Sequence, residues 1–326
     1  MYLVLIRLSA LGDILRALPA WKNIVGAFPG ARIKAVVEDR HSFLLDPLAG
    51  VEPVVLRRSE LSNPLMALRE LSRVAKLIQG ADASLDFHGI LKSALIPRLA
   101  GIKARWGDGI TKEGAGWLQN YGPAFKKQDR YSQALGLSNC FGSCHGITNL
   151  GLFRPIFKDA CLPTCDAWPV ANASRRPRIL LVPGTSPAGA NKRWPLDKWL
   201  QLAAELKNSA DLRWSLGPSE ASLRKWLPER SGVNALPAVP FWELASAIRT
   251  ADRVIVGDTG LLHLAVLLGV RVTALMGPSD PIISGIPEGT GDIVRASSDC
   301  SPCRERRCLR RTCMEHIYLN QVLATL

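Results

Sequence analysis

Short apolar runs alternate with longer amphipathic stretches through the first hundred residues of the chain. Three of the runs predict buried strands: residues 2–8, 33–37 and 84–87. Three stretches with apolar side chains at helical spacing predict helices: residues 14–25, 64–78 and 91–99. This alternation of strand and helix predicts a parallel sheet with helices on both faces.

The alternation fades between residues 139 and 177, where Gly, Pro and Cys are frequent, and it restarts at residue 178. Further strands are predicted at residues 179–182, 212–216, 254–256 and 272–276, and further helices at residues 196–206, 241–249 and 261–268. We therefore predict an α/β chain of two Rossmann-like domains, residues 1–165 and 178–326, joined by a linker at residues 166–177. Ligands of such folds bind at the carboxyl ends of the strands, so we expect the site in a cleft between the domains.

The composition is that of a soluble globular protein, with 47% hydrophobic and 21% charged residues. No apolar run approaches the roughly 20 residues that are needed to cross a bilayer. Residues 2–8 have no basic segment before them and no small-residue cleavage site after them, so we interpret them as a strand and not as a signal peptide. We expect a cytoplasmic protein.

Lys and Arg outnumber Asp and Glu by 41 to 28, and the resulting net charge of +13 favours anionic partners. Nucleic acid, phosphorylated metabolites and an anionic membrane surface all fit this charge. The basic residues are spread along the chain, with one dense cluster at residues 304–311. No nucleic-acid-binding motif or row of stacking aromatic residues is present. We therefore expect no nucleic-acid partner, and a basic nucleic-acid-binding protein is the non-enzyme alternative.

The strand-to-helix turn at residues 257–263 has the composition of an anion site. It follows the apolar run 253–256, contains two glycines with Asp258 and Thr259, and leads into the apolar segment 262–268. Thr259 is placed to cap that helix, whose free N–H groups and positive dipole end suit a phosphate. An ordinary capped turn and a phosphate site are both consistent with this segment alone.

A second strand-end loop carries Thr185 and Ser186 and continues to Lys192. Two hydroxyls, backbone N–H groups and a compact positive charge suit a phosphate, whereas a loop with a solvated Lys–Arg pair is the plainer interpretation. Two loops of this kind in one domain favour the phosphate. Glu220 follows a third predicted strand, and its carboxylate can accept hydrogen bonds from ribose hydroxyls.

Asp13 begins the helix after the first strand, at the sheet edge that we expect to face the cleft. It is either a helix-start carboxylate favoured by the dipole or a general base that removes a proton from an acceptor hydroxyl. The loop before it is not G-x-G-x-x-G, so a dinucleotide site is unsupported there. Because the sequence has no Asp-x-Asp pair and no His cluster with metal-ligand spacing, a leaving diphosphate would depend on Lys192 and backbone N–H groups.

The eight cysteines fall into groups, and disulfides are not expected in a cytosolic chain. The last group, Cys300, Cys303, Cys308 and Cys313, has the spacing C-x2-C-x4-C-x4-C, and its opening pair is similar to a metal knuckle. The neighbouring arginines and the lack of a strand signal argue against a metal. Bound zinc or a cluster and reduced structural thiols therefore both stay open.

Taken together, segments in both halves resemble the lipopolysaccharide heptosyltransferases of glycosyltransferase family 9. Those in the second half are GDTGLLHL at residues 257–264 with PSDP at 278–281, and PGTS at 183–186 with KRWP at 192–195. Those in the first half are SALGD at residues 9–13 and DFHGILKS at 86–93. The resemblance runs from Met1 to about residue 314.

The resemblance implies a GT-B fold and an inverting, metal-independent transfer from ADP-L-glycero-β-D-manno-heptose to the inner core of lipopolysaccharide, without a cofactor. It implies that Asp13 is the catalytic base and that Lys192 counters the charge of the leaving diphosphate. The implied donor contacts are Thr185, Ser186, Lys192, Glu220, Asp258, Thr259, Gly260 and His263, and the implied acceptor contacts are Arg57 and Arg58.

The acceptor would be a phosphorylated lipid, which implies an enzyme attached peripherally to the inner face of the inner membrane. Residues 6–13 are more similar to the first heptosyltransferase of the pathway, and residues 300–303 to the second. The acceptor, Kdo2-lipid A or heptosyl-Kdo2-lipid A, therefore stays open. The alternative activity is transfer from another nucleotide-sugar by an enzyme of the same family.

Overall fold

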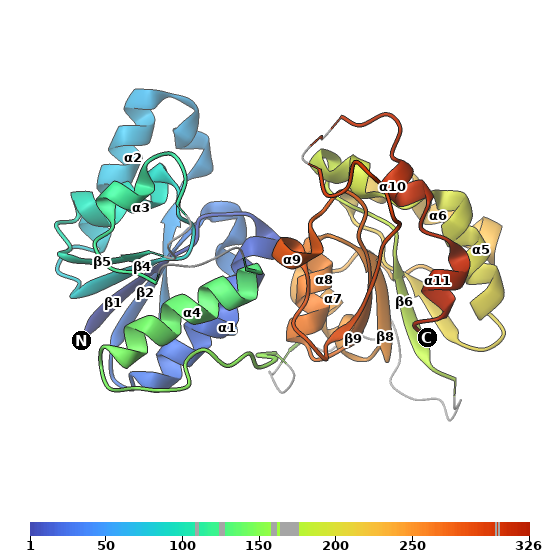
Figure 1. The fold of residues 1–326 in the computed structure, drawn as a ribbon, viewed down its shortest axis with the longest axis horizontal. Helices are drawn as coiled ribbons and strands as arrows, with labels where there is room; N and C mark the ends of the chain where they lie inside the picture. The colour runs from blue at the N-terminus through green and yellow to red at the C-terminus, as the bar shows by residue number, and fades with distance from the viewer. Residues whose placement is uncertain (108–110, 124–127, 158–161, 164–175, 304, 306) are drawn as a thin grey trace. The chain divides into compact units, whose positions relative to one another are not determined.

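The computed structural model describes residues 1–107, 111–123, 128–157, 162–163, 176–303, 305 and 307–326. The chain forms two compact units, Met1–Arg154 and Pro155–Leu326, whose elements are labelled in Figure 1. The Phe157 N–H donates to the Leu267 carbonyl at 2.9 Å, which attaches the start of the second unit to that unit's own core. The domain boundary that we placed at residue 165 stays a prediction, and residues 166–175 of the expected linker lie outside the described residues.

The first unit is built on a five-stranded parallel sheet with the order β3-β2-β1-β4-β5. Helices α1 and α4 cover one face and α2 and α3 the other (Figure 1). The elements are β1 (Tyr2–Ile6), α1 (Leu11–Ala27), β2 (Arg32–Glu38), β3 (Val51–Leu56), α2 (Pro64–Leu77), β4 (Ala83–Asp86), α3 (Leu91–Leu99), β5 (Ala104–Gly107) and α4 (Arg130–Ser143).

The second unit has a parallel sheet of its own, with the order β10-β9-β8-β6-β7. Helices α5, α6 and α11 lie on one side of it and α7 and α8 on the other (Figure 1). The elements are β6 (Arg178–Val182), α5 (Leu196–Leu206), β7 (Asp211–Trp214), α6 (Leu223–Ser231), α7 (Phe241–Arg249), β8 (Arg253–Gly257), α8 (Gly260–Leu267), β9 (Arg271–Leu275), α9 (Pro281–Ser284), β10 (Gly291–Val294), α10 (Thr312–Glu315) and α11 (Leu319–Leu323).

The central strands explain the apolar runs in the sequence. Strand β1 pairs with β2 on one side and β4 on the other, and its residues from Leu3 to Ile6 are fully buried. A strand covered by helices on both faces has no solvent-facing side, so its side chains are apolar without alternation. The prediction of parallel sheets with helices on both faces is confirmed.

Each sheet has one point at which the strand order reverses. In the first unit the crossovers diverge at the adjacent strands β1 and β4, and in the second at the adjacent strands β6 and β8. At such a point the loops after the two strands leave in opposite directions and open a crevice at the carboxyl ends, where α/β proteins bind ligands. The loops after β1, β4, β6 and β8 are therefore the first place to look for chemistry.

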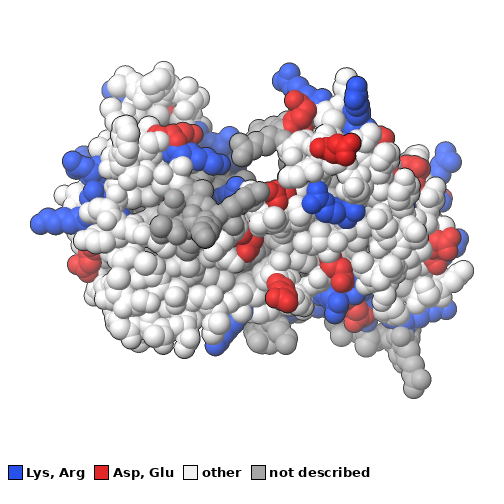
Figure 2. Space-filling model, in the orientation of Figure 1, with Lys and Arg blue, Asp and Glu red and all other residues white. Residues whose placement is uncertain are grey.

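No helix within the described residues is both long and apolar enough to cross a bilayer. On the face shown in Figure 2, the described Lys and Arg side chains are interspersed with Asp and Glu. The positive charge of the chain is therefore spread over this face, as the sequence indicates.

Trp199 in α5 is a central packing residue of the second unit. It is 1% exposed and makes edge-to-face contacts with Trp194 at 5.2 Å and Trp214 at 6.2 Å between ring centroids. Because the helix cannot close the space that the indole fills, Trp199→Ala should lower the unfolding free energy of this unit by about 3–5 kcal/mol. Urea unfolding checks this value, with the partly exposed Trp226→Ala as control. Equal, small losses in both variants would contradict the packing role.

Candidate active site

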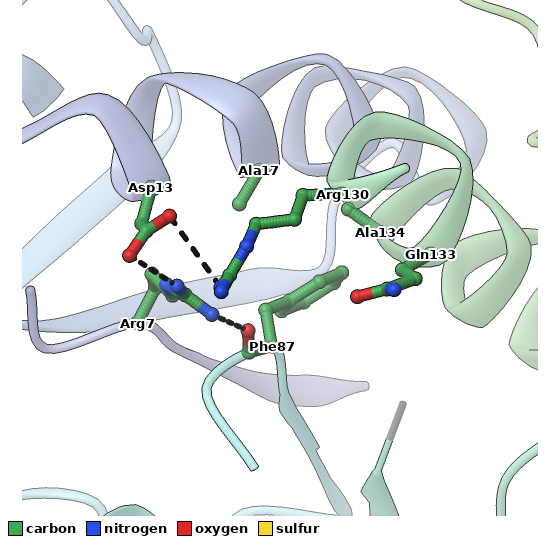
Figure 3. Close-up of a pocket in the computed structure, with 7 residues that line it drawn as sticks. All are labelled: Arg7, Asp13, Ala17, Phe87, Arg130, Gln133 and Ala134. Carbon is green, nitrogen blue, oxygen red and sulfur yellow. Dashed lines mark hydrogen bonds and ion pairs between the residues drawn. The ribbon is translucent and has the colours of Figure 1, made fainter. Parts of the chain in front are cut away.

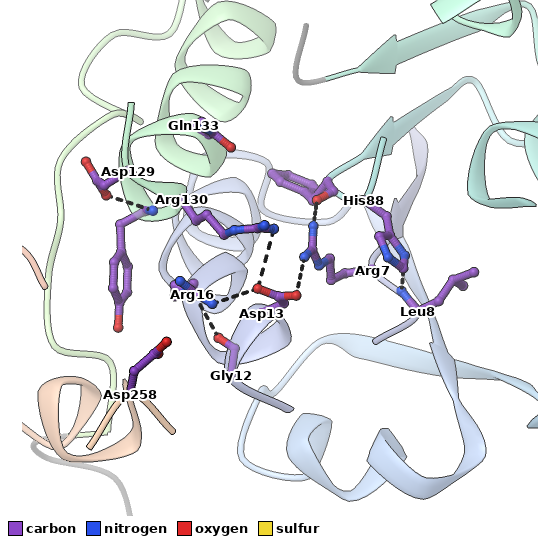
Figure 4. Close-up of polar contacts among 12 residues, drawn as sticks. Arg7, Leu8, Gly12, Asp13, Arg16, His88, Asp129, Arg130, Gln133 and Asp258 are labelled. Carbon is purple, nitrogen blue, oxygen red and sulfur yellow. Dashed lines mark hydrogen bonds and ion pairs between the residues drawn. The ribbon is translucent and has the colours of Figure 1, made fainter. Parts of the chain in front are cut away.

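Asp13 lies in the first turn of α1, beyond the carboxyl end of β1, and three arginines surround it (Figure 4). Arg7 Nη2 is 2.9 Å from Asp13 Oδ2, and Arg16 Nη2 is 2.7 Å from Oδ1. Arg130 Nη1, at the start of α4, is 3.5 Å from Oδ1. Arg7 and Arg16 are buried, whereas the Arg130 side chain is 33% exposed. The carboxylate is therefore held by two buried cations and one accessible cation.

Backbone contacts fix the buried arginines. The Arg7 guanidinium donates to the Phe87 carbonyl after β4, and Arg16 Nε donates to the Gly12 carbonyl at 3.2 Å. Arg7 thus joins the loops after β1 and β4, the two strands at which the strand order reverses. The pairing of β1 with β4 thus fixes Arg7, and Arg7 in turn helps to hold the Asp13 carboxylate in place.

A small cavity opens beside this cluster (Figure 3). Its lining residues are Arg7, Asp13, Ala17, Phe87, Arg130, Gln133 and Ala134. Its volume of about 10 Å³ is close to the space that one water molecule requires. The Asp13 side chain is 23% exposed. A small polar group can therefore approach Asp13 beside Arg130.

Asp13 is ionised over the whole physiological pH range. Burial raises the pKa of its carboxyl, but the three guanidinium groups, with Arg7 the strongest, outweigh burial and hold the pKa well below its usual range. The same burial lowers the pKa of Arg7, which Asp13 partly offsets. As it stands, the carboxylate is a strong hydrogen-bond acceptor and a weak proton acceptor.

His88 follows β4 in the same region. Asp86 Oδ1 accepts hydrogen bonds from the N–H groups of His88 at 2.9 Å and Gly89 at 3.3 Å, which fixes the turn. His88 Nδ1 accepts a hydrogen bond from the Leu8 N–H at 3.3 Å. Burial, and next the positive charge of Arg7, lower the pKa of His88 to about 3. The imidazole is therefore neutral and carries its proton on Nε2.

The loop after β6 is ordered by Arg193. Its Nε donates to Thr185 Oγ1 at 3.0 Å, and its Nη2 donates to the Thr185 carbonyl at 3.0 Å and to Glu220 Oε1 at 3.2 Å. Glu220 Oε2 accepts from the Gly217 N–H at 3.1 Å. A Cβ at Gly184 would lie 2.5 Å from the Glu220 carboxyl carbon, so a side chain there would push Glu220 away from its contacts with Arg193 and Gly217. The structure thus brings Thr185 and Glu220 together, with Ser186 exposed beside them.

Lys192 and Asp258 form an ion pair across β6 and β8, with 2.6 Å between Nζ and Oδ2. Ser279, in the turn after β9, donates a second hydrogen bond to Asp258 Oδ2. Burial raises the pKa of Asp258, but the Lys192 ammonium outweighs burial and lowers it overall. The Asp258 side chain is 8% exposed and that of Lys192 is 32% exposed. The cation therefore remains accessible to an anionic ligand.

Helix α8 begins at Gly260, with Thr259 at the N-cap position. The expected cap is only partly correct, because the Thr259 hydroxyl makes no capping hydrogen bond. Its Oγ1 is buried without a hydrogen-bond partner among the described residues. His263 is fully buried in α8 and acts electrostatically on Asp258.

Arg57 and Arg58 lie directly after β3, which is separated from β1 by β2. The Arg57 N–H donates to Glu70 Oε1 at 2.8 Å, and Arg58 Nη1 is 3.0 Å from Oε2 of the buried Glu38. Both arginine side chains are exposed. They share the carboxyl edge of the sheet with Asp13 but belong to a different strand-end loop.

The cysteine group lies on the segment between β10 and α10 and on α10 itself. Burial, and next the thiols of Cys300, Cys303 and Cys308, raise the pKa of the Cys313 thiol. The four thiols are thus near neighbours. As placed, no three His, Cys, Asp or Glu side chains of the described part of the chain can hold a metal ion. The expected metal independence of the reaction stays a prediction.

Residues 145–313 match the model of glycosyltransferase family 9 (heptosyltransferase). The chain belongs to this family. The enzyme is 26% identical to lipopolysaccharide heptosyltransferase 1 of Pseudomonas aeruginosa, over 94% of this chain and 87% of the relative. It is 28% identical to the protein of the same name from Escherichia coli K12, over 87% and 90% of the two chains.

The fold of this glycosyltransferase is similar to E. coli heptosyltransferase WaaC. The structure of WaaC with ADP has a TM-score of 0.74 and 22% identity, and the similarity covers 99% of this chain and 98% of WaaC. The structure of WaaC with ADP-2-deoxy-2-fluoro heptose has a TM-score of 0.73 and 21% identity, with the same coverage. The α/β GT-B fold class that the sequence indicates is confirmed.

Sequence reasoning missed the arginines that define both clusters. Arg16 follows Asp13 at the i,i+3 spacing of a helical ion pair, and Arg193 is adjacent to Lys192, so both carried a local signal. Arg7 and Arg130 carried none, because the sheet and the packing of α4 on α1 bring them to Asp13.

The neutral state of His88 has a measurable effect on stability. Unfolded, this imidazole binds a proton below pH 6.5, whereas in the folded protein it does so only near pH 3. The unfolded state therefore binds more protons in this window, and the unfolding free energy should fall as pH drops, by up to about 1.4 kcal/mol per pH unit. In His88→Gln, whose amide oxygen can still accept from Leu8, this part of the pH dependence should disappear.

Urea titrations of both proteins at several pH values check this result. Parallel stability curves between pH 6.5 and pH 4 would contradict a buried neutral imidazole.

Proposed function

We propose that this glycosyltransferase transfers heptose from ADP-L-glycero-β-D-manno-heptose to the phosphorylated inner core of lipopolysaccharide, with inversion and without a catalytic metal. The acceptor is Kdo2-lipid A or heptosyl-Kdo2-lipid A. The observation that carries the proposal is that the loops at both strand-order reversals hold a largely buried carboxylate with an accessible cation: Asp13 with Arg130 in one unit, and Asp258 with Lys192 in the other. The WaaC structures with ADP and an ADP-heptose analogue support this donor.

The donor binds to the second unit. Lys192 has three N–H donors, so it can keep its contact with Asp258 and still bind the diphosphate. Thr185 and Ser186 in the loop after β6 also contact the diphosphate. The start of α8 at Gly260 adds free N–H groups and a positive dipole end. Glu220 accepts two hydrogen bonds within the protein and has lone pairs left for ribose hydroxyls.

Asp258 and Thr259 bind the transferred sugar. Asp258 is held by Lys192 and Ser279, so its remaining oxygen has a fixed direction in which to accept a sugar hydroxyl. The buried Thr259 hydroxyl, which has no partner among the described residues, donates to the sugar or the diphosphate. His263, buried beneath both, supports the start of the helix.

Asp13 is the general base, and the acceptor itself makes it more basic. The low pKa of the carboxyl opposes proton transfer, because a general base works best with a pKa near the working pH. Arg130 has the longest of the three contacts and is the most exposed partner. An anionic group of the acceptor that binds Arg130 draws positive charge away from Asp13 and raises its pKa. Arg57 and Arg58 bind further acceptor anions from the neighbouring loop.

The reaction is a single displacement. The acceptor oxygen bonds to the anomeric carbon as the bond between that carbon and the β-phosphate oxygen breaks. The acceptor proton passes to Asp13, and ADP leaves with its charge balanced by Lys192 and the N–H groups of α8. Attack opposite the leaving group inverts the anomeric configuration.

The acceptor lipid implies where the enzyme works. We place it in the cytoplasm, peripherally bound to the inner face of the inner membrane, where its net charge of +13 attracts phosphorylated lipids. The alternative activity is transfer from another nucleotide-activated sugar, which the same diphosphate contacts would also bind.

Asp13→Asn removes the base and keeps the shape of the side chain. Heptose transfer from ADP-heptose to the acceptor that the wild type uses, Kdo2-lipid A or heptosyl-Kdo2-lipid A, should fall roughly 10²–10⁴-fold. ADP affinity, measured by calorimetry, should stay unchanged because the donor contacts lie in the other unit. Asp46→Asn, at an exposed position in the same unit, is the matched control. Wild-type turnover by Asp13→Asn would remove the general-base assignment.

Lys192→Ala removes the cation that balances the leaving diphosphate. Both ADP affinity and turnover should fall, with turnover lower by about 10²–10³-fold. Lys207→Ala, which removes an exposed cation from the same unit, should match the wild type. An unchanged transfer rate in Lys192→Ala would exclude the leaving-group role.

A further inference from the structure

Four cysteines of the second unit face one cavity. Cys300, Cys303, Cys308 and Cys313 line a space of about 250 Å³, together with Asn191, Pro278, Arg310, Arg311 and Thr312. Cys313 stands on α10, and the other three lie on the loop between β10 and α10. The four cysteines of the C-x2-C-x4-C-x4-C segment thus line the same cavity.

Core packing explains only one of these cysteines. Cys313 is 5% exposed and belongs to the hydrophobic core with Met314. Cys303 and Cys308 are partly exposed, and Cys300 is exposed. A free cysteine that serves only as a small apolar side chain is among the most buried residue types. Reduced structural thiols therefore do not account for the three on the loop.

The surroundings of the cavity suit metal-bound thiolates. Four thiolates around one divalent ion carry a net charge of about −2, and Arg310 and Arg311 line the same cavity. The Arg311 N–H already donates to Cys308 Sγ at 3.5 Å. In the sequence these neighbouring arginines argued against a metal. In the structure they can balance the negative charge of metal-bound thiolates.

The cysteine loop is also attached to the donor-binding loops at two places. On one side, Ser301 Oγ donates to the Gly277 carbonyl at 2.6 Å and the Cys303 N–H donates to the Pro278 carbonyl at 2.9 Å. The next residue, Ser279, donates to Asp258. On the other side, Asn191 Nδ2 donates to the Glu305 carbonyl at 2.7 Å, next to Lys192.

We propose that Cys300, Cys303, Cys308 and Cys313 bind one thiophilic metal ion, zinc or a single iron, that fixes the loop against the donor-binding turns. A set of four sulfur ligands selects these metals. The three loop cysteines move toward Cys313 on binding, since the thiols as placed do not yet converge. The metal does no chemistry on the sugar. It positions Pro278–Ser279 and Asn191–Lys192, and this second effect rests on the proposed function.

Metal analysis of the purified full-length protein tests the site directly. The wild type should contain about one equivalent of zinc or iron per chain, and the element found identifies the ion. Cys300→Ser/Cys303→Ser should lose it. The matched control, Cys140→Ser/Cys144→Ser at the end of α4 in the first unit, should keep it. A wild type that carries no metal and binds none when zinc is added would overturn the proposal.

ADP affinity tests the positioning effect. Removal of the metal from the wild type with a strong chelator should weaken ADP binding by about tenfold or more, and added metal should restore it. This measurement does not depend on whether the double variant folds. Unchanged ADP affinity in the metal-free protein would limit the metal to the cysteine loop and contradict the positioning role.

The two proposals fail in different ways. A metal-loaded protein that transfers no heptose would overturn the proposed function and leave the metal site standing. An active enzyme that carries no metal and binds none when zinc is added would overturn the metal site and leave the proposed function standing.

Discussion

The strand order of the two parallel sheets is the constraint from which the rest of the structure follows. Because parallel strands all end at one edge, each sheet collects its strand-end loops there, and the reversal of strand order separates two of them. In the first unit these are the loops after β1 and β4, which carry Arg7, Asp13 and His88. In the second they are the loops after β6 and β8, which carry Lys192 and Asp258.

Electrostatics distinguishes these clusters from ordinary surface ion pairs. Asp13 is paired with two buried arginines, and Asp258 is almost fully buried beneath Lys192. Buried ion pairs add little net stability, because the desolvation of both charges offsets their attraction. Their presence at both reversal points is better explained by ligands: an accessible cation in each cluster, Arg130 or Lys192, remains able to bind an anion.

This arrangement also links binding to chemistry. An aspartate that is paired with three arginines is a poor base. It becomes a better base when one of those arginines binds another anion. In the proposed reaction, a phosphorylated acceptor supplies that anion at the moment when a base is needed. The enzyme would therefore activate Asp13 only in the presence of its acceptor, which limits hydrolysis of a bound sugar nucleotide.

Most of the fold could be predicted from the sequence, and the missed strands share one property. Strands β3, β5 and β10 all lie at the edge of a sheet. Edge strands are half exposed, so their apolar signal is weak, and β3 also contains Pro53, which an edge strand tolerates. The central strands, buried on both faces, were identified within a few residues of their observed ends.

The residues of the candidate site also fall into those that the sequence could predict and those that it could not. Asp13, Lys192 and Asp258 follow strands whose ends the local sequence indicates, so their places could be predicted. Two partners of Asp13, Arg7 and Arg130, could not be predicted, because the sheet brings Arg7 to the carboxylate and helix packing brings Arg130 from a distant part of the chain. The missing capping hydrogen bond of the Thr259 hydroxyl also has no sequence signature.

The central claim is that the two charged clusters serve transfer from ADP-heptose to a lipid acceptor. The most direct measurement compares the wild-type enzyme with ADP-heptose, UDP-sugar and GDP-sugar donors on Kdo2-lipid A and on heptosyl-Kdo2-lipid A, with the product mass read by mass spectrometry. The account predicts the addition of one heptose to one of the two acceptors, from ADP-heptose alone. Equal transfer from a UDP- or GDP-sugar, or no transfer from ADP-heptose to either acceptor, would contradict it.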